Sequence, residues 1–233
     1  MKKYILSLMV AAASAISFTA CVDDTTEGLT RFTYYPVIEL EGDTYMIVDK
    51  GSSFQDPGFV ATLNGEDISS AVSVKSSVNT AQSGVYSVQY SAVNEDGFSA
   101  SASRTVVVLD PNDPIEGFYY TSPSSYRVNS AGAQTVYGSS FEILVIGNGD
   151  GTYTVDDMLG GYYGQRAGYG ARYYCEGLIE VDEDGNVSCL DSYVPGWGDY
   201  LDDLVDGKYD AATGTFTWDA QYAGMDFYVT MSK

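Results

Sequence analysis

A segment rich in glycine, tyrosine and arginine is the stretch of this sequence best suited to contact a ligand. Residues 160–174 read GGYYGQRAGYGARYY, and a tryptophan follows downstream between two glycines. Glycine lets the backbone bend sharply or approach a partner closely, while tyrosine and tryptophan present flat apolar faces with a polar edge. Such surfaces suit sugars, which combine apolar ring faces with hydroxyl groups. The candidate contacts are Tyr162, Tyr163, Tyr169 and Trp197, with Arg166 and Arg172 as hydrogen-bond donors.

The same residues also fit a purely structural role, because large aromatic side chains are largely buried on average and can close the end of a barrel. Runs of acids at 156–157, 182–184 and 202–203 favour solvated turns in a chain with 32 Asp and Glu. The sequence contains no histidine and no nucleophile motif, which excludes imidazole-based catalysis and histidine-ligated metals. We therefore expect a non-catalytic protein without a metal or cofactor.

Charge and composition narrow the class of protein further. Only 11 Lys and Arg oppose the 32 acids, and the net charge of −21 repels phosphate backbones and anionic lipid surfaces. Nucleic acid is therefore not an expected partner. The 21 tyrosines and 25 glycines favour strands and tight turns over helices.

The first 20 residues have the order of a secretory signal. Two lysines precede an apolar run, Tyr4 to Phe18, and the small residues Thr19 and Ala20 lead directly to Cys21. The run is too short to span a bilayer, which requires ~20 apolar residues. We expect residues 1–20 to be removed and Cys21 to be lipidated; an ordinary secretory signal with an incidental cysteine is the alternative.

This segment resembles the lipoprotein signals of Bacteroidota. The acidic Val22-Asp23-Asp24 resembles the surface-export signal of that group. The resemblance implies a protein anchored by lipid in the outer membrane through Cys21 and facing the cell exterior. Residues 21–33 are polar and lack apolar periodicity, so they are expected to form a flexible tether.

A first folded unit is predicted over residues 34–110. Tyr86, Val88, Tyr90 and Ala92 alternate with polar residues, which is the pattern of a half-buried strand. The turn at 94–97 leads into a second strand at 98–109, so the two form an antiparallel hairpin. About seven short strands in this length favour a β-sandwich.

This unit resembles the bacterial Ig-like domain of pesticidal crystal proteins and many surface proteins. The likeness rests on the segments GSSFQDPG at 51–58, GEDI at 65–68, SGVYSVQY at 83–90 and RTVVV at 104–108. It implies a spacer that lifts a neighbouring domain off the membrane. The acidic turn at 65–67 lacks the spacing of a dedicated calcium loop.

Residues 111–114 contain two prolines and mark a stiff linker to a second unit at 115–233. Segments 141–146, 215–220 and 227–232 alternate in polarity or are apolar on both faces, and Asp/Gly-rich turns separate the strands. A meander of about eight strands closes best as an up-and-down barrel. The predicted fold is all-β, an Ig-like sandwich followed by an eight-stranded antiparallel barrel.

The opening IEGFY at 115–119 resembles the first strand of lipocalin-like barrels. The order of an Ig-like unit and a Gly/Tyr-rich barrel resembles Bacteroidota surface lipoproteins without assigned function, often placed among glycan-uptake systems. That resemblance implies a membrane transport complex as a partner and carries no catalytic residues.

Two cysteines other than Cys21 raise the question of a disulfide. If Val181 faces Val187 across its turn, Cys189 faces Ile179, and Cys175 lies four residues further along, about 13 Å away at ~3.3 Å per residue. A bridge needs Cα atoms within ~7 Å, so this register favours free thiols. A bulge near residue 177 would change the register and permit the bond.

Three functions remain open on sequence grounds. The first is a surface protein that binds glycan or glycopeptide as an accessory of a nutrient-uptake system. The second is a structural or assembly subunit whose aromatic surface packs on a partner protein. The third is a lipocalin-like barrel with an open interior for a small apolar ligand; a packed interior would move any site to the Gly/Tyr surface.

Overall fold

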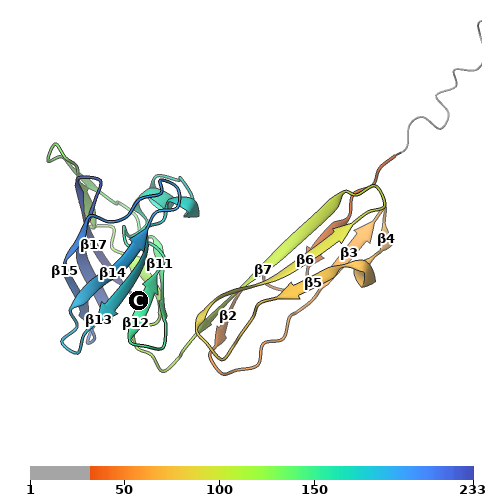
Figure 1. The fold of residues 1–233 in the computed structure, drawn as a ribbon, viewed down its shortest axis with the longest axis horizontal. Coiled ribbons are helices and arrows are strands. Elements are labelled where there is room, and N and C mark those ends of the chain that lie inside the picture. The colour runs from red at the N-terminus through yellow and green to blue at the C-terminus, as the bar shows by residue number, and fades with distance from the viewer. Residues whose placement is uncertain (1–31) are drawn as a thin grey trace, which may run out of the picture.

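Residues 32–233 are described by the structure, a computed structural model, and they form two β-rich units joined by a short linker (Figure 1). The predicted signal, the lipidation site Cys21 and all but the last two residues of the tether lie outside the described residues. Within the described part, no helix has the length and apolar character needed to cross a membrane. The prediction of an all-β fold with a sandwich and a barrel is confirmed.

The first unit is a sandwich of two sheets. One sheet has the order β2 (Tyr45–Asp49), β7 (Ser99–Leu109), β6 (Gly84–Val93) and β5 (Ser73–Ser76), and the other has the order β1 (Val37–Leu40), β3 (Phe59–Leu63) and β4 (Glu66–Asp67). A short 3-10 helix, η1 (Ser69–Ala71), follows β4. Strand β2 runs parallel to β7, and the other pairs are antiparallel.

The long hairpin of β6 and β7 supplies much of the sandwich core. Val88, Tyr90 and Ala92 are buried while the residues between them are exposed, as the alternating pattern predicts. The predicted turn joins the strands, with Val93 paired to Ser99.

Arg104 is fully buried in this sandwich and ties its loops together. Its guanidinium forms an ion pair with Asp56 at 3.1 Å and donates to the carbonyls of Glu41 at 2.7 Å and Gly58 at 3.1 Å, as well as to that of Asp43. A buried cation of this kind is tolerated because Asp56 balances its charge and the backbone carbonyls accept hydrogen bonds from its terminal nitrogens.

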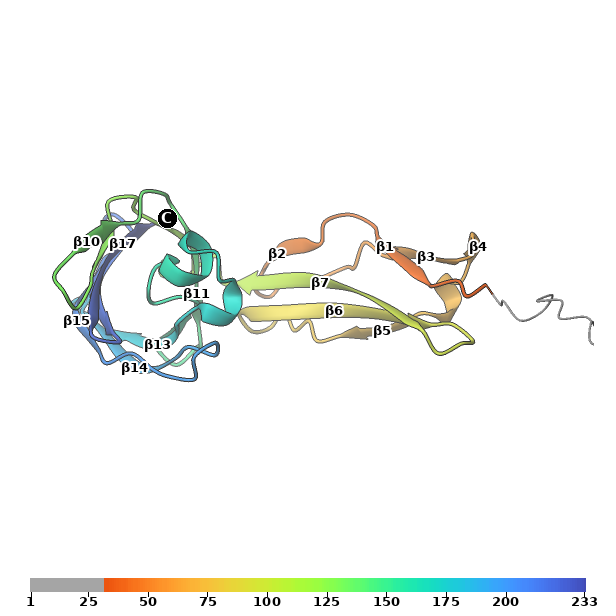
Figure 2. The same cartoon turned by 90° about the horizontal axis from the view of Figure 1, so that it is seen from above.

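The second unit is an antiparallel barrel (Figure 2). Strand β8 closes the ring, because it pairs with both β17, the last strand, and β11. The strands in sequence are β8 (Gly117–Thr121), β11 (Glu142–Gly147), β12 (Thr152–Val155), β13 (Glu176–Val181), β14 (Val187–Tyr193), β15 (Asp203–Asp210), β16 (Thr215–Tyr222) and β17 (Met225–Ser232). A hairpin of β9 (Tyr126–Val128) and β10 (Gln134–Val136) joins this sheet through β17. A bridge between Asn186 and Lys208 brings the β14 and β15 segments together at the seam.

The barrel interior is a packed core of large side chains. Strands β16 and β17 contribute Phe216, Trp218 and Phe227, all of which are buried, as their alternation predicts. Tyr119 packs edge-on against Phe216 with ring centroids 5.1 Å apart. The alternative of an open, lipocalin-like cup for a small apolar ligand is therefore wrong, because aromatic side chains occupy the interior.

Strand β11 is apolar on both faces because each face packs against a different partner. Leu144 and Ile146 form a small buried cluster with Val107 of the sandwich, while Ile143 and Val145 point into the barrel core. The linker adds polar contacts: the buried Glu116 carboxylate accepts hydrogen bonds from the backbone N–H groups of Asp110 at 2.7 Å and Gly147 at 3.1 Å. Apolar packing and this carboxylate thus hold the units together at the joint.

Candidate functional site

The connection between β12 and β13, residues 156–175, folds over the end of the barrel and is called the cap segment below. It contains η2 (Tyr162–Arg166), a π-helix, and η3 (Ala171–Tyr173), a 3-10 helix. In Figure 1 it lies at the end of the barrel opposite the linker. Short π-helical turns occur frequently at functional sites.

The buried carboxylate of Asp157 holds both ends of the cap segment. It accepts backbone hydrogen bonds from Leu159 at 3.0 Å, Gly161 at 3.2 Å and Cys175 at 3.2 Å. Burial raises the pKa of Asp157 to about 7, although these N–H groups oppose the rise. Burial also raises the pKa of the neighbouring Asp156 to about 6. Asp157 thus serves the architecture of the site and is not presented to solvent.

Three barrel side chains anchor the backbone of the cap segment. The indole of Trp218 donates to the carbonyl of Met158 at 2.8 Å, Tyr137 donates to that of Leu159 at 2.6 Å, and Thr121 donates to that of Gly160 at 3.0 Å. The cap segment is therefore bonded to the barrel wall at three successive residues.

Glycines in the cap segment are required by close packing. Gly161 has a φ of 84°, and a Cβ placed there would lie 2.5 Å from Cβ of Phe141. A Cβ on Gly164 would lie 2.1 Å from the ring of Tyr174. The glycine-rich composition therefore lets the backbone approach the barrel so closely that no larger residue fits.

Four aromatic side chains meet at the outer side of the cap segment, and we call Tyr163, Tyr169, Tyr173 and Trp197 the aromatic surface. The Trp197 ring stands edge-on to Tyr163 and Tyr173, each at 4.8 Å, and to Tyr169 at 6.2 Å. Trp197 is 42% exposed and Tyr169 is 55% exposed. These rings offer an apolar surface to solvent from fixed positions.

The turn that carries Trp197 is fixed from two sides. A Cβ on Gly196 would lie 2.4 Å from the ring of Tyr173, so the turn packs directly on the cap segment. At its other end, Asp199 accepts a hydrogen bond from the hydroxyl of the buried Tyr222 at 2.6 Å. The tryptophan ring is thus held by the barrel and not by its loop alone.

The structure separates the six sequence-predicted contacts into groups. Tyr163, Tyr169 and Trp197 lie together in the aromatic surface. Tyr162 instead points into the core, 5% exposed, and fulfils the structural role that the sequence left open. Arg166 is exposed at the end of η2, and Arg172 is exposed in η3.

Sequence reasoning did not single out Tyr173, Tyr222 or Arg127 as parts of this site. Tyr173 lies within the glycine- and tyrosine-rich segment, and that composition is the signal that points to it. Tyr222 and Arg127 come from strands distant in sequence, and only the pairing of β9 with β17 brings Arg127 to this end of the barrel.

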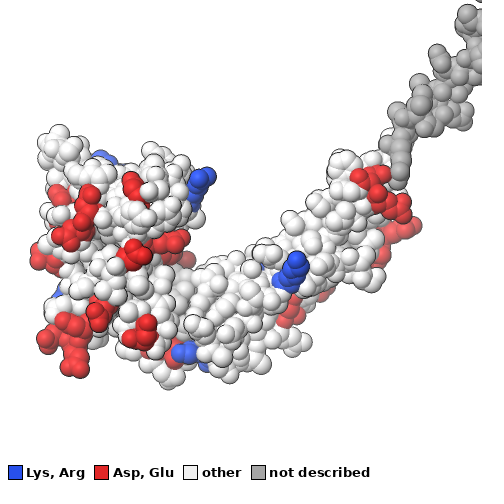
Figure 3. Space-filling view, in the orientation of Figure 1, with Lys and Arg blue, Asp and Glu red and all other residues white. Residues whose placement is uncertain are grey.

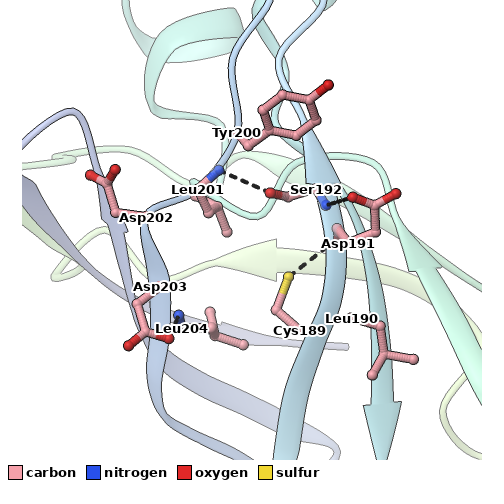
Figure 4. A pocket seen from close by; sticks show the side chains of 9 residues that line it. All are labelled: Cys189, Leu190, Asp191, Ser192, Tyr200, Leu201, Asp202, Asp203 and Leu204. Atoms are coloured by element: carbon pink, nitrogen blue, oxygen red, sulfur yellow. Dashed lines mark hydrogen bonds between the residues drawn. The ribbon is translucent and has the colours of Figure 1, made fainter.

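Apart from the aromatic surface, a cleft lies on the barrel wall between β14 and β15 (Figure 4). It has a volume of about 260 Å³, and Leu190, Asp191, Tyr200 and Asp202 are among its lining residues. Cys189 also lines it, and its thiol donates to the carbonyl of Asp191 at 3.2 Å. The charged residues that line the cleft, Asp191, Asp202 and Asp203, are all acidic, so the cleft does not favour the binding of an anion.

The two thiols of the described chain are free. Val181 pairs with Val187 and Ile179 with Cys189, which is the register expected from sequence. A bulge does occur between Leu178 and Ile179, but Cys175 is buried and unbonded and Cys189 is half-buried and unbonded. Within residues 32–233, no group of three or more His, Cys, Asp or Glu is placed to hold a metal ion.

The fold defines a class, that of two-domain β proteins in which an Ig-like sandwich carries an antiparallel barrel. A family model for the Ig-like domain of bacterial surface proteins matches residues 38–108, and a second model, for a C-terminal domain, matches residues 109–233. The crystal structure of the lipoprotein BT2262 from Bacteroides thetaiotaomicron is similar over 85% of this chain and 100% of its own, with a TM-score of 0.71 and 38% identity. The chain belongs to the family of this lipoprotein.

Two other solved structures come from ZmpB of Clostridium perfringens. One contains the M60 catalytic domain with CBM51-1 and CBM51-2, at 18% identity and a TM-score of 0.28 over 52% of this chain and 15% of that chain. The other contains CBM51-2 in complex with GlcNAc and INT domains, at 17% identity and a TM-score of 0.27 over 51% and 31%. Scores this low support no inference. None of the curated proteins searched matches this chain.

Proposed function

We propose that this protein binds glycan at the aromatic surface, without chemical conversion, as a lipid-anchored accessory of a nutrient-uptake system. The observation that carries the proposal is the pair of exposed rings of Tyr169 and Trp197, both of which pack on the partly buried Tyr163 of the cap segment. Aromatic side chains fixed in this way contribute contact area at little cost in conformational entropy, which favours binding to the apolar faces of sugar rings.

The position of the site supports the proposal. The cap segment lies at the end of the barrel away from the linker (Figure 1). With Cys21 in the outer membrane and the chain outside the cell, the sandwich would act as a spacer and the aromatic surface would face the medium. Beside Trp197, the carboxyl group of Asp199 is engaged by Tyr222, which suits a structural role better than a catalytic one.

Glycan binding is tested by screening the purified full chain against an array of bacterial, plant and host oligosaccharides. We expect retention of at least one glycan, and Trp197→Ala should weaken its affinity by about tenfold or more, as for a buried aromatic contact at an interface. The matched control is Tyr120→Ala, because Tyr120 is 48% exposed on β8 and lies outside the aromatic surface. Equal losses for both variants would contradict the site.

An assembly role is the competing proposal. Recovery of one stoichiometric protein partner by crosslinking on intact cells, lost in Trp197→Ala and without retention of any glycan, would favour that role over glycan binding.

A further inference from the structure

Arg127 points into the end of the barrel next to the aromatic surface. In the pairing of β9 with β17 it lies opposite Phe227, whose side chain is fully buried in the core. Directly opposed residues in an antiparallel pair project to the same side of the sheet, so Arg127 faces inward. Its Nε atom is buried and has no hydrogen-bond partner among residues 32–233.

Arg127 shares the ring of Tyr162 with Arg166. The guanidinium carbons lie 4.9 Å and 5.0 Å from the ring centroid. The Nε atom of Arg166 donates to the carbonyl of Tyr137 at 3.1 Å, and Arg166 as a whole residue is exposed. Two cations therefore gather at one buried aromatic ring beneath the aromatic surface.

Neither arginine has a carboxylate partner within the described part of the chain. This is unexpected in a protein with 32 acids, and Figure 3 shows acidic groups over much of the visible barrel face with basic groups at the cap end. By contrast, Arg104 pairs with Asp56, and Lys50 pairs with Asp110.

A partly buried guanidinium without a counterion has lost hydration that a cation–π contact only partly replaces. An anion that reached Arg127 and Arg166 would complete their hydrogen bonding.

The aromatic surface and the arginine pair are contiguous. Tyr163 packs edge-on to Tyr162 with centroids 5.1 Å apart and also contacts Trp197. The guanidinium carbon of Arg127 lies 4.9 Å from the centroid of the same Tyr162 ring, and Arg127 counteracts the rise in the pKa of Tyr163 that burial causes. A sugar ring on the aromatic surface would thus place a substituent within reach of the arginines.

We propose that Arg127 and Arg166 form a subsite for the oxyanion group of an acidic glycan, a carboxylate in a uronic or sialic acid or a sulfate ester. The planar guanidinium groups match both oxyanions in geometry and charge. The inference rests on the proposed glycan binding and adds the class of sugar.

The test compares paired probes that differ in the oxyanion alone, using the purified full chain in detergent micelles. The pairs are oligogalacturonate and its methyl ester, sialyllactose and its methyl ester, and 6-sulfo-N-acetyllactosamine and N-acetyllactosamine. We expect the acidic member of one pair to bind about 10- to 100-fold more tightly than its partner, the range for hydrogen bonds to charged groups. The pair that shows the preference identifies carboxylate or sulfate.

Arg127→Gln and Arg166→Gln should each reduce this preference by about tenfold. Arg166→Gln alters an exposed side chain and keeps the test valid if Arg127→Gln unfolds. The control is Lys75→Gln, which removes one exposed positive charge from the sandwich and should leave the preference unchanged. Equal affinity for acidic and neutral members would overturn the oxyanion subsite and leave glycan binding intact. Failure of every glycan on the array and in these pairs would overturn both proposals.

Discussion

Replacement of Asp157 by asparagine should remove the larger part of a pH dependence of stability that originates in the cap segment, while the smaller contribution of Asp156, whose pKa is raised to about 6, remains. The carboxyl group is fully buried, and its pKa is raised from 3.8 to about 7, chiefly by burial. A raised pKa in the folded state means that folding takes up a proton between these two values. Stability should therefore be greatest at acidic pH, fall as pH rises toward 7, and level off above it.

The size of the effect follows from the shift. One pKa unit corresponds to about 1.4 kcal/mol, so between pH 5 and pH 7.5 titration of Asp157 should lower the free energy of unfolding by about 2.5 kcal/mol. The exposed aspartates with lowered pKa, such as Asp182, act below pH 4 and do not contribute in this window. The side-chain amide of Asp157→Asn cannot titrate. Its NH₂ group faces a backbone N–H donor in place of an acceptor oxygen, and the loss of that hydrogen bond should lower the free energy of unfolding by about 1–3 kcal/mol at every pH.

Urea unfolding followed by tryptophan fluorescence measures this dependence directly. Both tryptophans of the chain, Trp197 and Trp218, lie in the barrel unit, so the signal reports that unit alone. The stability difference between wild type and Asp157→Asn should shrink by about 2.5 kcal/mol from pH 5 to pH 7.5. Asp182→Asn, in an exposed turn, serves as the control and should keep the wild-type slope. Parallel profiles for wild type and Asp157→Asn would refute the reasoning.

Three further outcomes are expected. Arg104→Ala should destabilise the sandwich by about 3–5 kcal/mol in chemical unfolding, because it leaves Asp56 and several carbonyls without their partner; a loss within 0.5 kcal/mol would contradict that role. Burial raises the thiol pKa of both Cys175 and Cys189, so native alkylation should be slow, with two thiols released by denaturation without reductant; thiols that appear only after reduction would indicate a disulfide. Cys21→Ser should move the protein from the detergent to the aqueous phase on phase partitioning, and retention in detergent would argue against the lipid anchor.

Local periodicity and turn chemistry were sufficient to predict several strands and the pairing of some that are neighbours in sequence. The register of β13 with β14 follows from a tight turn and a period of two, and it places Cys189 opposite Ile179 as expected. The hairpin of β6 and β7 and the buried faces of β16 and β17 follow from the same rule. These features depend on neighbours in sequence, which is why sequence alone is enough to find them.

The composition of residues 160–174 likewise pointed to the segment that carries the candidate site. It did not distinguish Tyr162, which is buried in the core, from Tyr163, the adjacent residue of the π-helix, which is only partly buried. A π-helix is not signalled by any simple spacing of residue types. Both rings pack on Phe227 of the barrel core, and Tyr163 also contacts Trp197.

Contacts between segments that are distant in the chain could not be predicted from the sequence. Arg127 reaches Tyr162 and Arg166 because β9 pairs with β17, and the outer face of β11 is apolar because the sandwich covers it. The filled barrel interior is also a result of packing among strands that are far apart in the chain. Strand formation and turn type depend on residues a few positions apart, whereas the site depends on the closure of the barrel, which brings together side chains that no local pattern relates.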